Sequence, residues 1–315
     1  MRYGSFFLEE ITPFESMLRR MDEVIVQKRT RYQELTLFRS QGFGKILVLD
    51  KDVQSSESDE YVYHDTLVHP AMLAHPSPRS ACIVGGGEGA TLREVLRHPS
   101  IERCTMVDID GELMELAREW LPEWHRGAFS DPRARVIAAD ARGWLEANPE
   151  RYDVILVDLT DPVGADSPAR FLFTEEWYRL LSERLEPGGV VALQAGMILP
   201  THHREHSVIH HTVAQVFRHV RSYRTYIPSY FLQFGFLLAS QATDPASLEV
   251  SLYAQRCHER GLALRYLTPE LIRAQYALPG DLQKALREEQ MVSRDADPFW
   301  LDAEGRAQQG PVGPR

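Results

Sequence analysis

The chain has 315 residues, and 43% of them are hydrophobic, so it can bury a sizeable core and is not globally disordered. Its formal net charge of -10 argues against nucleic acid as a partner and suits a cationic substrate. Three cysteines without a Cys-x-x-Cys pair predict a reduced, cytoplasmic protein. No apolar run reaches about 18 residues, so we expect no contact with a membrane.

Residues 1–65 predict a small N-terminal β domain. Short strands are expected at 24–26, 32–38 and 45–49, with a turn between the last two. A block of this size cannot hold a deep pocket alone, so we expect it to pack on a neighbour or on a second subunit. A helix should follow over 61–73, because prolines come directly after that segment.

Residues 66–300 predict a catalytic α/β domain, because apolar runs alternate with helical patterns and thereby indicate a parallel sheet. Strands are expected at 81–84, 104–107, 135–139, 153–157 and 190–193, and helices at 90–98, 111–121, 141–147, 174–185 and 208–217. Segments 220–226 and 234–239 should pair as a terminal antiparallel hairpin, and mostly helical structure should follow from Leu248. Residues 301–315 are expected to form a polar C-terminal tail that is disordered from Gly305.

A glycine loop, Gly85-Gly86-Gly87-Glu88-Gly89, follows the first of these strands. Glycines at this place let the backbone approach a nucleoside closely. The carboxylate of Glu88 would repel a pyrophosphate, so a ligand with positive charge is favoured over a dinucleotide. The alternative is a plain tight turn with Glu88 in solvent.

Carboxylates also follow the next two strands, where ligands bind in open parallel sheets. Asp108 stands about 20 residues after the loop, at the place of an acid that takes ribose hydroxyls. Its neighbour Asp110 is expected to cap the helix that begins near Gly111. Asp140 can accept a hydrogen bond from an adenine amino group, cap the helix over 141–147, or do both.

The segment Asp158-Leu159-Thr160-Asp161-Pro162 carries the strongest signal for chemistry. Two acids at one strand end should face the crevice together. Close carboxylates raise one pKa, which favours proton acceptance near neutral pH. The alternative is a pair of turn-forming aspartates.

Two further polar groups leave alternatives open. Asp59, Glu60, Tyr63 and His64 form either a solvated helix start or one wall of a binding site. The histidines between positions 202 and 211 lack a completing cysteine or carboxylate, so we expect exposed histidines on a helix and no metal.

With these residues in place, the chain resembles the polyamine aminopropyltransferases, the spermidine synthase family. The resemblance runs from Gln33 to Ser240 and rests on the glycine loop and on Leu49-Asp50-Lys51-Asp52-Val53-Gln54, Asp59-Glu60-Tyr61-Val62-Tyr63-His64, Leu92-Arg93-Glu94-Val95, Asp131-Pro132-Arg133 and Asp158 to Pro162. It implies a Rossmann-like sheet of the class I methyltransferase type behind the small β domain. It also implies a homodimer or homotetramer.

The resemblance implies roles for individual residues. Asp158 resembles the catalytic base. Contacts to the donor nucleoside are implied for Gln33, Gly85, Gly87, Glu88, Asp108, Asp140 and Ala141. Contacts to the polyamine are implied for Tyr63, His64, Glu88, Asp158, Asp161 and Tyr230.

Two positions depart from ordinary spermidine synthases, which have Asp in place of Glu88 and Glu in place of Asp108. The combination found here looks like thermospermine synthases and the thermophile enzymes that act on agmatine or triamines. We therefore expect agmatine or a triamine as the favoured acceptor, with putrescine possible.

The expected reaction is aminopropyl transfer from decarboxylated S-adenosylmethionine to a small cationic amine, with release of 5′-methylthioadenosine. The donor is a co-substrate, and no metal or other cofactor is expected. Two alternatives are an S-adenosylmethionine-dependent methyltransferase and a non-catalytic polyamine-binding protein. The first leaves Glu88 facing a methionine carboxylate, and the second needs no base at Asp158. A dehydrogenase is disfavoured by the acidic loop.

Overall fold

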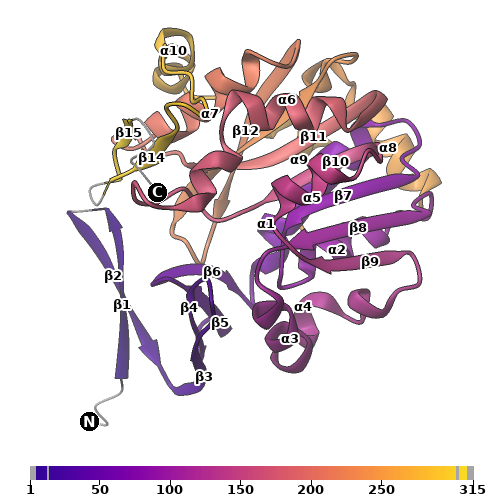
Figure 1. Cartoon of the computed structure of the whole chain (residues 1–315). Coiled ribbons are helices and arrows are strands. Elements are labelled where there is room, and N and C mark those ends of the chain that lie inside the picture. Colours follow the sequence, from indigo (N-terminus) through magenta and orange to yellow (C-terminus); the bar gives the residue numbers. More distant parts are fainter. Residues whose placement is uncertain (1–4, 13, 303–304, 311–315) are drawn as a thin grey trace.

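The computed structural model describes residues 5–12, 14–302 and 305–310. A small β domain at the N-terminus leads into a larger α/β domain (Figure 1). The small domain has two antiparallel sheets, one of β1 and β2 and one of four strands in the order β3-β4-β5-β6. The bounds of these strands are Ser5–Thr12, Glu15–Met21, Glu23–Arg29, Glu34–Ser40, Gly44–Leu49 and Asp52–Ser56.

The three strands expected in this domain are present as β3, β4 and β5, whereas β1, β2 and β6 were not expected. The hairpin of β1 and β2 extends away from the four-stranded sheet in Figure 1. One face of this hairpin packs inward through Phe7, whose ring lies 5.6 Å from that of Phe38. The opposite face leaves Phe6, Leu8 and Leu18 more than half exposed.

The large sheet has seven strands in the order β12-β13-β11-β10-β7-β8-β9. Its strands are β7 Ser80–Gly85, β8 Arg103–Asp108, β9 Ala134–Ala138, β10 Tyr152–Asp158, β11 Leu185–Met197, β12 His219–Ile227 and β13 Leu232–Ser240. The pairs from β11 to β9 are parallel, and the hairpin of β12 and β13 is antiparallel. The predicted α/β fold is therefore confirmed. The chain crosses from one side of β7 to the other between β9 and β10, which opens a crevice at the carboxyl ends of β7 and β10.

Helices cover both faces of this sheet (Figure 1). They are α1 Glu60–Ala74, α2 Ala90–Leu96, α3 Gly111–Trp120, α4 Pro122–His125, α5 Ala141–Ala147, α6 Glu175–Glu183, α7 Arg204–Ala214, α8 Val250–Glu259, α9 Pro269–Gln275 and α10 Gly280–Glu288. Side chains of α1, α2 and α3 share one hydrophobic core cluster, and those of α5, α6 and α7 share another. The apolar runs of the strands supply both clusters, as expected for strands that are buried on both faces.

The end of the chain returns to the sheet. Strand β14 (Phe299–Leu301) pairs with β15 (Ala307–Gln309), and Phe299 and Ala307 are buried. The expectation of disorder from Gly305 is therefore wrong for 307–309, while 311–315 lie outside the described residues. No helix in the described part of the chain has the length and apolarity to cross a membrane.

Candidate active site

One cavity of about 1810 Å³ lies between the small β domain and the carboxyl ends of the large sheet. All the residues predicted from the sequence to bind substrate line this cavity. They are Gln33, Tyr63, His64, Gly85, Gly87, Glu88, Asp108, Asp140, Ala141, Asp158, Asp161 and Tyr230. The structure therefore brings the predicted residues together, although each individual role stays a prediction.

The glycine loop lies directly against the end of β10. The backbone N–H of Gly86 donates to the carbonyl oxygen of Asp158 at 3.0 Å. Gly85 has φ +82°, and a Cβ atom there would lie 2.1 Å from that same oxygen. A Cβ at Gly87 would lie 2.8 Å from Oδ2 of Asp108. Glycine is required at these positions by backbone conformation and by close approach.

Two hydroxyl groups hold the carboxylate of Asp158. Tyr63 donates from Oη to Oδ1 at 2.7 Å, and Thr91 donates from Oγ1 to Oδ2 at 2.5 Å. Tyr63 comes from α1 and Thr91 from the first turn of α2, so two helices fix the side chain of Asp158 at the end of β10. A carboxylate held in this way is oriented for proton transfer into the cavity.

Glu88 is buried and paired, not solvated as the plain-turn alternative required. Its Oε2 accepts from Oγ of Ser55 at 2.6 Å, and its Oε1 lies 2.8 Å from Nε2 of His64. The Nδ1 of His64 lies 2.9 Å from Oε2 of Glu60. Burial lowers the pKa of His64, but hydrogen bonds to Glu60 and Glu88 outweigh it and hold that pKa well above its usual value. Both ring nitrogens of His64 thus face carboxylates, which favours the protonated form of the ring.

The pair of Glu60 and His64 continues into a line of alternating charges. Arg93 places Nη2 2.9 Å from Oε2 of Glu60 and Nε 2.7 Å from Oε1 of Glu94. Burial raises the pKa of Glu60, but His64 and Arg93 lower it below its usual value. Each buried charge thus has an opposite partner, which is the condition for tolerating such charges in a protein interior.

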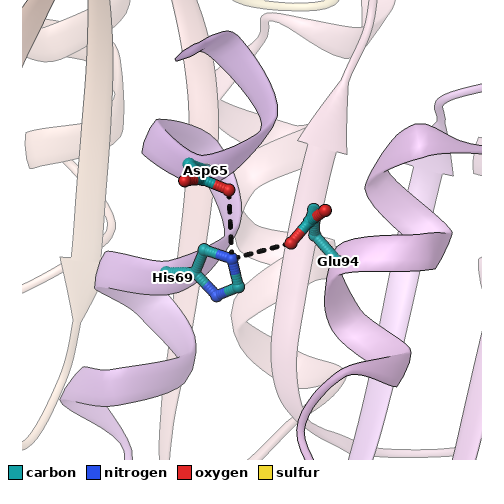
Figure 2. Close-up of side chains that lie close together, drawn as sticks. All are labelled: Asp65, His69 and Glu94. Atoms are coloured by element: carbon teal, nitrogen blue, oxygen red, sulfur yellow. Dashed lines mark hydrogen bonds and ion pairs between the residues drawn. The ribbon is translucent and has the colours of Figure 1, made fainter. Parts of the chain in front are cut away.

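The line ends at Asp65, His69 and Glu94, which Figure 2 shows side by side. Nε2 of His69 lies 2.9 Å from Oε2 of Glu94 and 3.4 Å from Oδ1 of Asp65. Burial lowers the pKa of His69, but its hydrogen bonds to both acids raise that pKa overall. These three side chains thus form a buried cluster in which the imidazole of His69 lies between two carboxylates.

Asp161 lies three residues after the end of β10. Its Oδ1 accepts a hydrogen bond from Nε2 of Gln194 at 2.9 Å. Burial raises the pKa of Asp161 to about 6, and the hydrogen bond from Gln194 lowers it only in part. One of the two acids in the segment 158–161 thus has a raised pKa, as the sequence predicts. The cause of the raised pKa is burial, and not the repulsion between two carboxylates that the sequence suggests.

Asp108, Asp110 and Gln33 lie together where the sequence predicts nucleoside binding. Asp110 caps α3, as predicted, by accepting from the N–H groups of Glu112 and Leu113. Its Oδ2 also accepts from Nε2 of Gln33 at 2.8 Å, so the side chain of Gln33 is held in place. Burial, followed by the charge of Asp110, raises the pKa of Asp108 to about 6.

Asp140 caps α5 through the N–H of Gly143 at 3.0 Å. The carboxylate is exposed at the cavity and can still accept a second hydrogen bond. Capping and ligand binding are thus compatible at Asp140, as the sequence allowed.

The start of α1 is buried, so the solvated alternative is wrong. Asp59, Glu60 and His64 are each less than 5% exposed. Asp59 accepts from Oγ of Ser56 at 2.6 Å and from the N–H of Ser229 at 2.5 Å. Through Ser229, Asp59 fixes the neighbouring Tyr230, whose Oη donates to the carbonyl of Gln54.

The histidines near α7 are not exposed, in contrast to the prediction. His206 is fully buried and contacts the carbonyl of Ala195 and Oγ of Ser222, each at 2.9 Å. Burial lowers the pKa of His206 to about 3. The helix begins at Arg204 and not at residue 208, so His202 precedes it and cannot share a helix face with His206.

Sequence reasoning missed four polar residues of the cavity region, namely Ser55, Thr91, Gln194 and Glu205. Thr91 could have been found, since it stands in the first turn after the glycine loop. Gln194 follows the expected strand 190–193 directly, in the same position as the acids that end the other strands. Nothing in the local pattern marks Ser55 or Glu205.

Comparison with known proteins identifies two matching families of domains. Residues 60–248 match the spermine/spermidine synthase domain, and residues 5–57 match the spermidine synthase tetramerisation domain. A polyamine aminopropyltransferase of Aeropyrum pernix is 51% identical over 246 residues, which cover 78% of this chain and 77% of that protein. Polyamine aminopropyltransferase 2 of Pseudomonas aeruginosa is 41% identical over 294 residues, which cover 93% of this chain and 84% of that protein.

Solved structures agree with these matches. A spermidine synthase in complex with the transition-state analogue AdoDATO superposes with a TM-score of 0.84 at 29% identity, over 91% of this chain and 97% of the other. The spermidine synthase of Thermotoga maritima gives a TM-score of 0.82 at 28% identity, over 91% and 96% of the two chains. The chain therefore belongs to the spermine/spermidine synthase family of polyamine aminopropyltransferases.

Proposed function

We propose that the protein transfers the aminopropyl group of decarboxylated S-adenosylmethionine to a primary amine, forming a longer polyamine and 5′-methylthioadenosine. The observation that carries this proposal is that Glu88, Asp158 and Asp161 line one cavity with the nucleoside-binding candidates. This acidic surface suits a donor that carries a sulfonium and a free ammonium. It disfavours S-adenosylmethionine, whose additional carboxylate would lie against these acids.

The reaction is a direct displacement. The neutral amine nitrogen attacks the carbon next to the sulfonium, the carbon–sulfur bond breaks, and its electron pair passes to sulfur. An alkylamine has a pKa of about 10.4, so freeing its lone pair at pH 7 costs about 4–5 kcal/mol. Asp158 takes the proton that the amine gives up, and its fixed orientation by Tyr63 and Thr91 supports this role.

The donor nucleoside is assigned to the other end of the cavity. Asp108 takes the ribose hydroxyls, and the glycine loop lets the sulfonium approach the backbone. Asp140 and Ala141 receive the adenine, and Gln33 closes the site from the small β domain. Glu88 faces the aminopropyl arm, where its pairing with His64 limits the cost of burying its charge.

The acceptor that we propose is agmatine or a triamine, with putrescine as a weaker substrate. Glu88 is one methylene longer than aspartate, and Tyr230 adds an aromatic wall on which a guanidinium or an alkyl chain can lie. The expected discrimination is modest, on the order of 1–3 kcal/mol, because methylene-scale differences rarely give more.

The proposed reaction needs no resident metal or cofactor, because a displacement of this kind transfers no electrons to an external carrier. The sulfonium of the co-substrate already provides the leaving group. Asp158 supplies the only proton transfer that the scheme requires.

We further propose a cytoplasmic homotetramer. The match of residues 5–57 to a tetramerisation domain and the exposed Phe6, Leu8 and Leu18 support assembly through the β1–β2 hairpin. The three cysteines are free, which fits a reducing compartment.

A turnover assay tests the proposed function. The protein is incubated with decarboxylated S-adenosylmethionine and, separately, with agmatine, spermidine or putrescine, and the products are separated by chromatography. Formation of methylthioadenosine in step with a longer amine is expected. Methylated product from S-adenosylmethionine would instead indicate a methyltransferase, and amine binding without any product would indicate a binding protein.

A further inference from the structure

Glu205, in the first turn of α7, has no role in the scheme above although it lines the same cavity. The residue is 5% exposed, and its buried Oε1 has no hydrogen-bond partner among the residues that the structure describes. The described residues place no Lys, Arg or His within ion-pair distance of it. The adjacent Arg204 pairs instead with Glu289, with 3.4 Å between Nε and Oε2.

The backbone makes room for this carboxylate. Gly196, near the end of β11, has φ +70°, and a Cβ atom there would lie 2.1 Å from Oε2 of Glu205. Every other residue type at position 196 would therefore displace the acid, in addition to straining the backbone. The position of the Glu205 carboxylate is thus fixed by two elements: α7 carries the residue, and Gly196 of β11 leaves the space for it.

The carboxylate of Glu205 lines the cavity together with those of Asp158 and Asp161. Asp158 lies at the glycine loop, and Asp161 is tied to Gln194 of β11. Gly196 follows Gln194 by two residues, at a point where the pairing of β11 with β13 is irregular. Asp161 and Glu205 therefore meet β11 two residues apart, so Glu205 lies next to Asp161 in the cavity and not at the glycine loop, which contacts Asp158.

A buried carboxylate without a partner is costly, so it calls for a ligand that supplies the missing charge. Burial, and after it the charge of Asp161, raises the pKa of Glu205 well above its usual value. This is the direction expected for a carboxyl group that has no cation beside it. Side-chain donors satisfy Asp158, Asp161 and Glu88, but none in the described part of the chain serves Oε1 of Glu205.

We propose that Glu205 binds the cationic group of the acceptor that is remote from the attacking amine, and that it thereby selects amines with a second, distant charge. This inference rests on the proposed function. A guanidinium is the best-matched group, because it can present two parallel N–H donors to one carboxylate. Glu205 is a specificity residue in this account and takes no part in the displacement at sulfonium.

The test compares two acceptors in wild type and Glu205→Gln. Agmatine carries a remote guanidinium, whereas n-butylamine carries only the amine that would react. A hydrogen bond to a charged group is worth about 1.5–3 kcal/mol, so the Gln variant should lose roughly 10- to 100-fold in kcat/KM for agmatine. Its kcat/KM for n-butylamine should stay within about twofold, on the same reasoning, because that amine offers nothing to position 205.

A binding measurement separates this inference from the proposed function. Calorimetry on the complex with methylthioadenosine, in which no turnover occurs, should show the same loss in affinity for agmatine and none for n-butylamine. Glu249→Gln serves as a control, since it removes an equal charge from an exposed position at the start of α8. Glu205→Asp keeps the charge but retracts it, so an intermediate loss for agmatine is expected, and this variant carries the test if the Gln protein does not fold.

The outcomes are distinct. If the wild-type protein turns over no amine, the proposed function fails, whereas the calorimetry still reports on Glu205. If Glu205→Gln and Glu205→Asp bind agmatine as tightly as wild type, or lose agmatine and n-butylamine equally, the inference is overturned.

Discussion

The proposed chemistry depends most directly on the side chain of Asp158. Replacement by Asn keeps its size and can keep one of its hydroxyl contacts, but it removes the proton acceptor. Loss of a general base typically lowers the rate by about 10²–10⁴-fold, so kcat for Asp158→Asn should fall in that range. Calorimetry should show nearly unchanged donor binding, because the proposed nucleoside contacts are made by other residues. Near-normal turnover of the variant between pH 7 and 9 would show that Asp158 is not the base.

A second prediction at this scale concerns the effect of pH on stability through Glu205. Because its folded-state pKa is raised, protonation of this acid stabilises the fold fully below about pH 4.3, its usual unfolded value. That stabilisation is lost as pH rises through the raised pKa. The melting temperature of wild type should therefore fall, relative to that of Glu205→Gln, between pH 5 and 9. A difference in melting temperature that is constant over this range would contradict the burial of an unpaired carboxylate.

The site residues that could be predicted from the sequence are those that follow the end of a strand. Asp108, Asp140, Asp158 and Asp161 were predicted because an apolar run precedes each of them closely. Their hydrogen-bond partners were not predicted, because these come from distant segments. The Tyr63 hydroxyl that holds Asp158 is 95 positions away in the chain.

At the scale of elements, the glycine loop is the feature that should tolerate substitution least. Gly85→Ala places a methyl group against the carbonyl oxygen of Asp158 and also forces a positive φ on alanine. Gly188→Ala is a matched control, since Gly188 has φ +85° but nothing within 4 Å of the added atom. The free energy of unfolding should fall by about 1–3 kcal/mol more for Gly85→Ala than for the control, as for other overpacked sites. Chemical denaturation measures both, and equal losses would refute the close approach of loop and strand.

Elements of the sheet were predictable where the pattern was long and strongly apolar. The hairpin of β1 and β2 escaped prediction because its outward face is also apolar, so Phe6, Phe7 and Leu8 show no alternation. The first turn of α7 escaped because Glu205 and His206 are polar residues in buried positions. Strands β14 and β15 have three residues each, too few for a period to be recognised.

At the scale of the whole molecule, the exposed face of the hairpin predicts assembly. Leu8 and Leu18 pair across β1 and β2, and both are more than half exposed. Leu18→Glu should bring a charge into the proposed subunit interface and shift the protein from the proposed tetramer towards smaller species. Sedimentation or size-exclusion chromatography with light scattering measures this. An unchanged molar mass would show that this face of the hairpin is a free surface and that the subunit interface lies elsewhere.

The central claim is that the donor transfers its aminopropyl group and not a methyl group. One competition experiment tests this claim most directly. The protein receives equal concentrations of S-adenosylmethionine and decarboxylated S-adenosylmethionine, together with agmatine, and mass spectrometry follows the products. We predict aminopropylated agmatine and methylthioadenosine in equal amounts, with no methylated amine, because Glu88, Asp158 and Asp161 disfavour a donor carboxylate. Methylated agmatine as the main product would contradict the account.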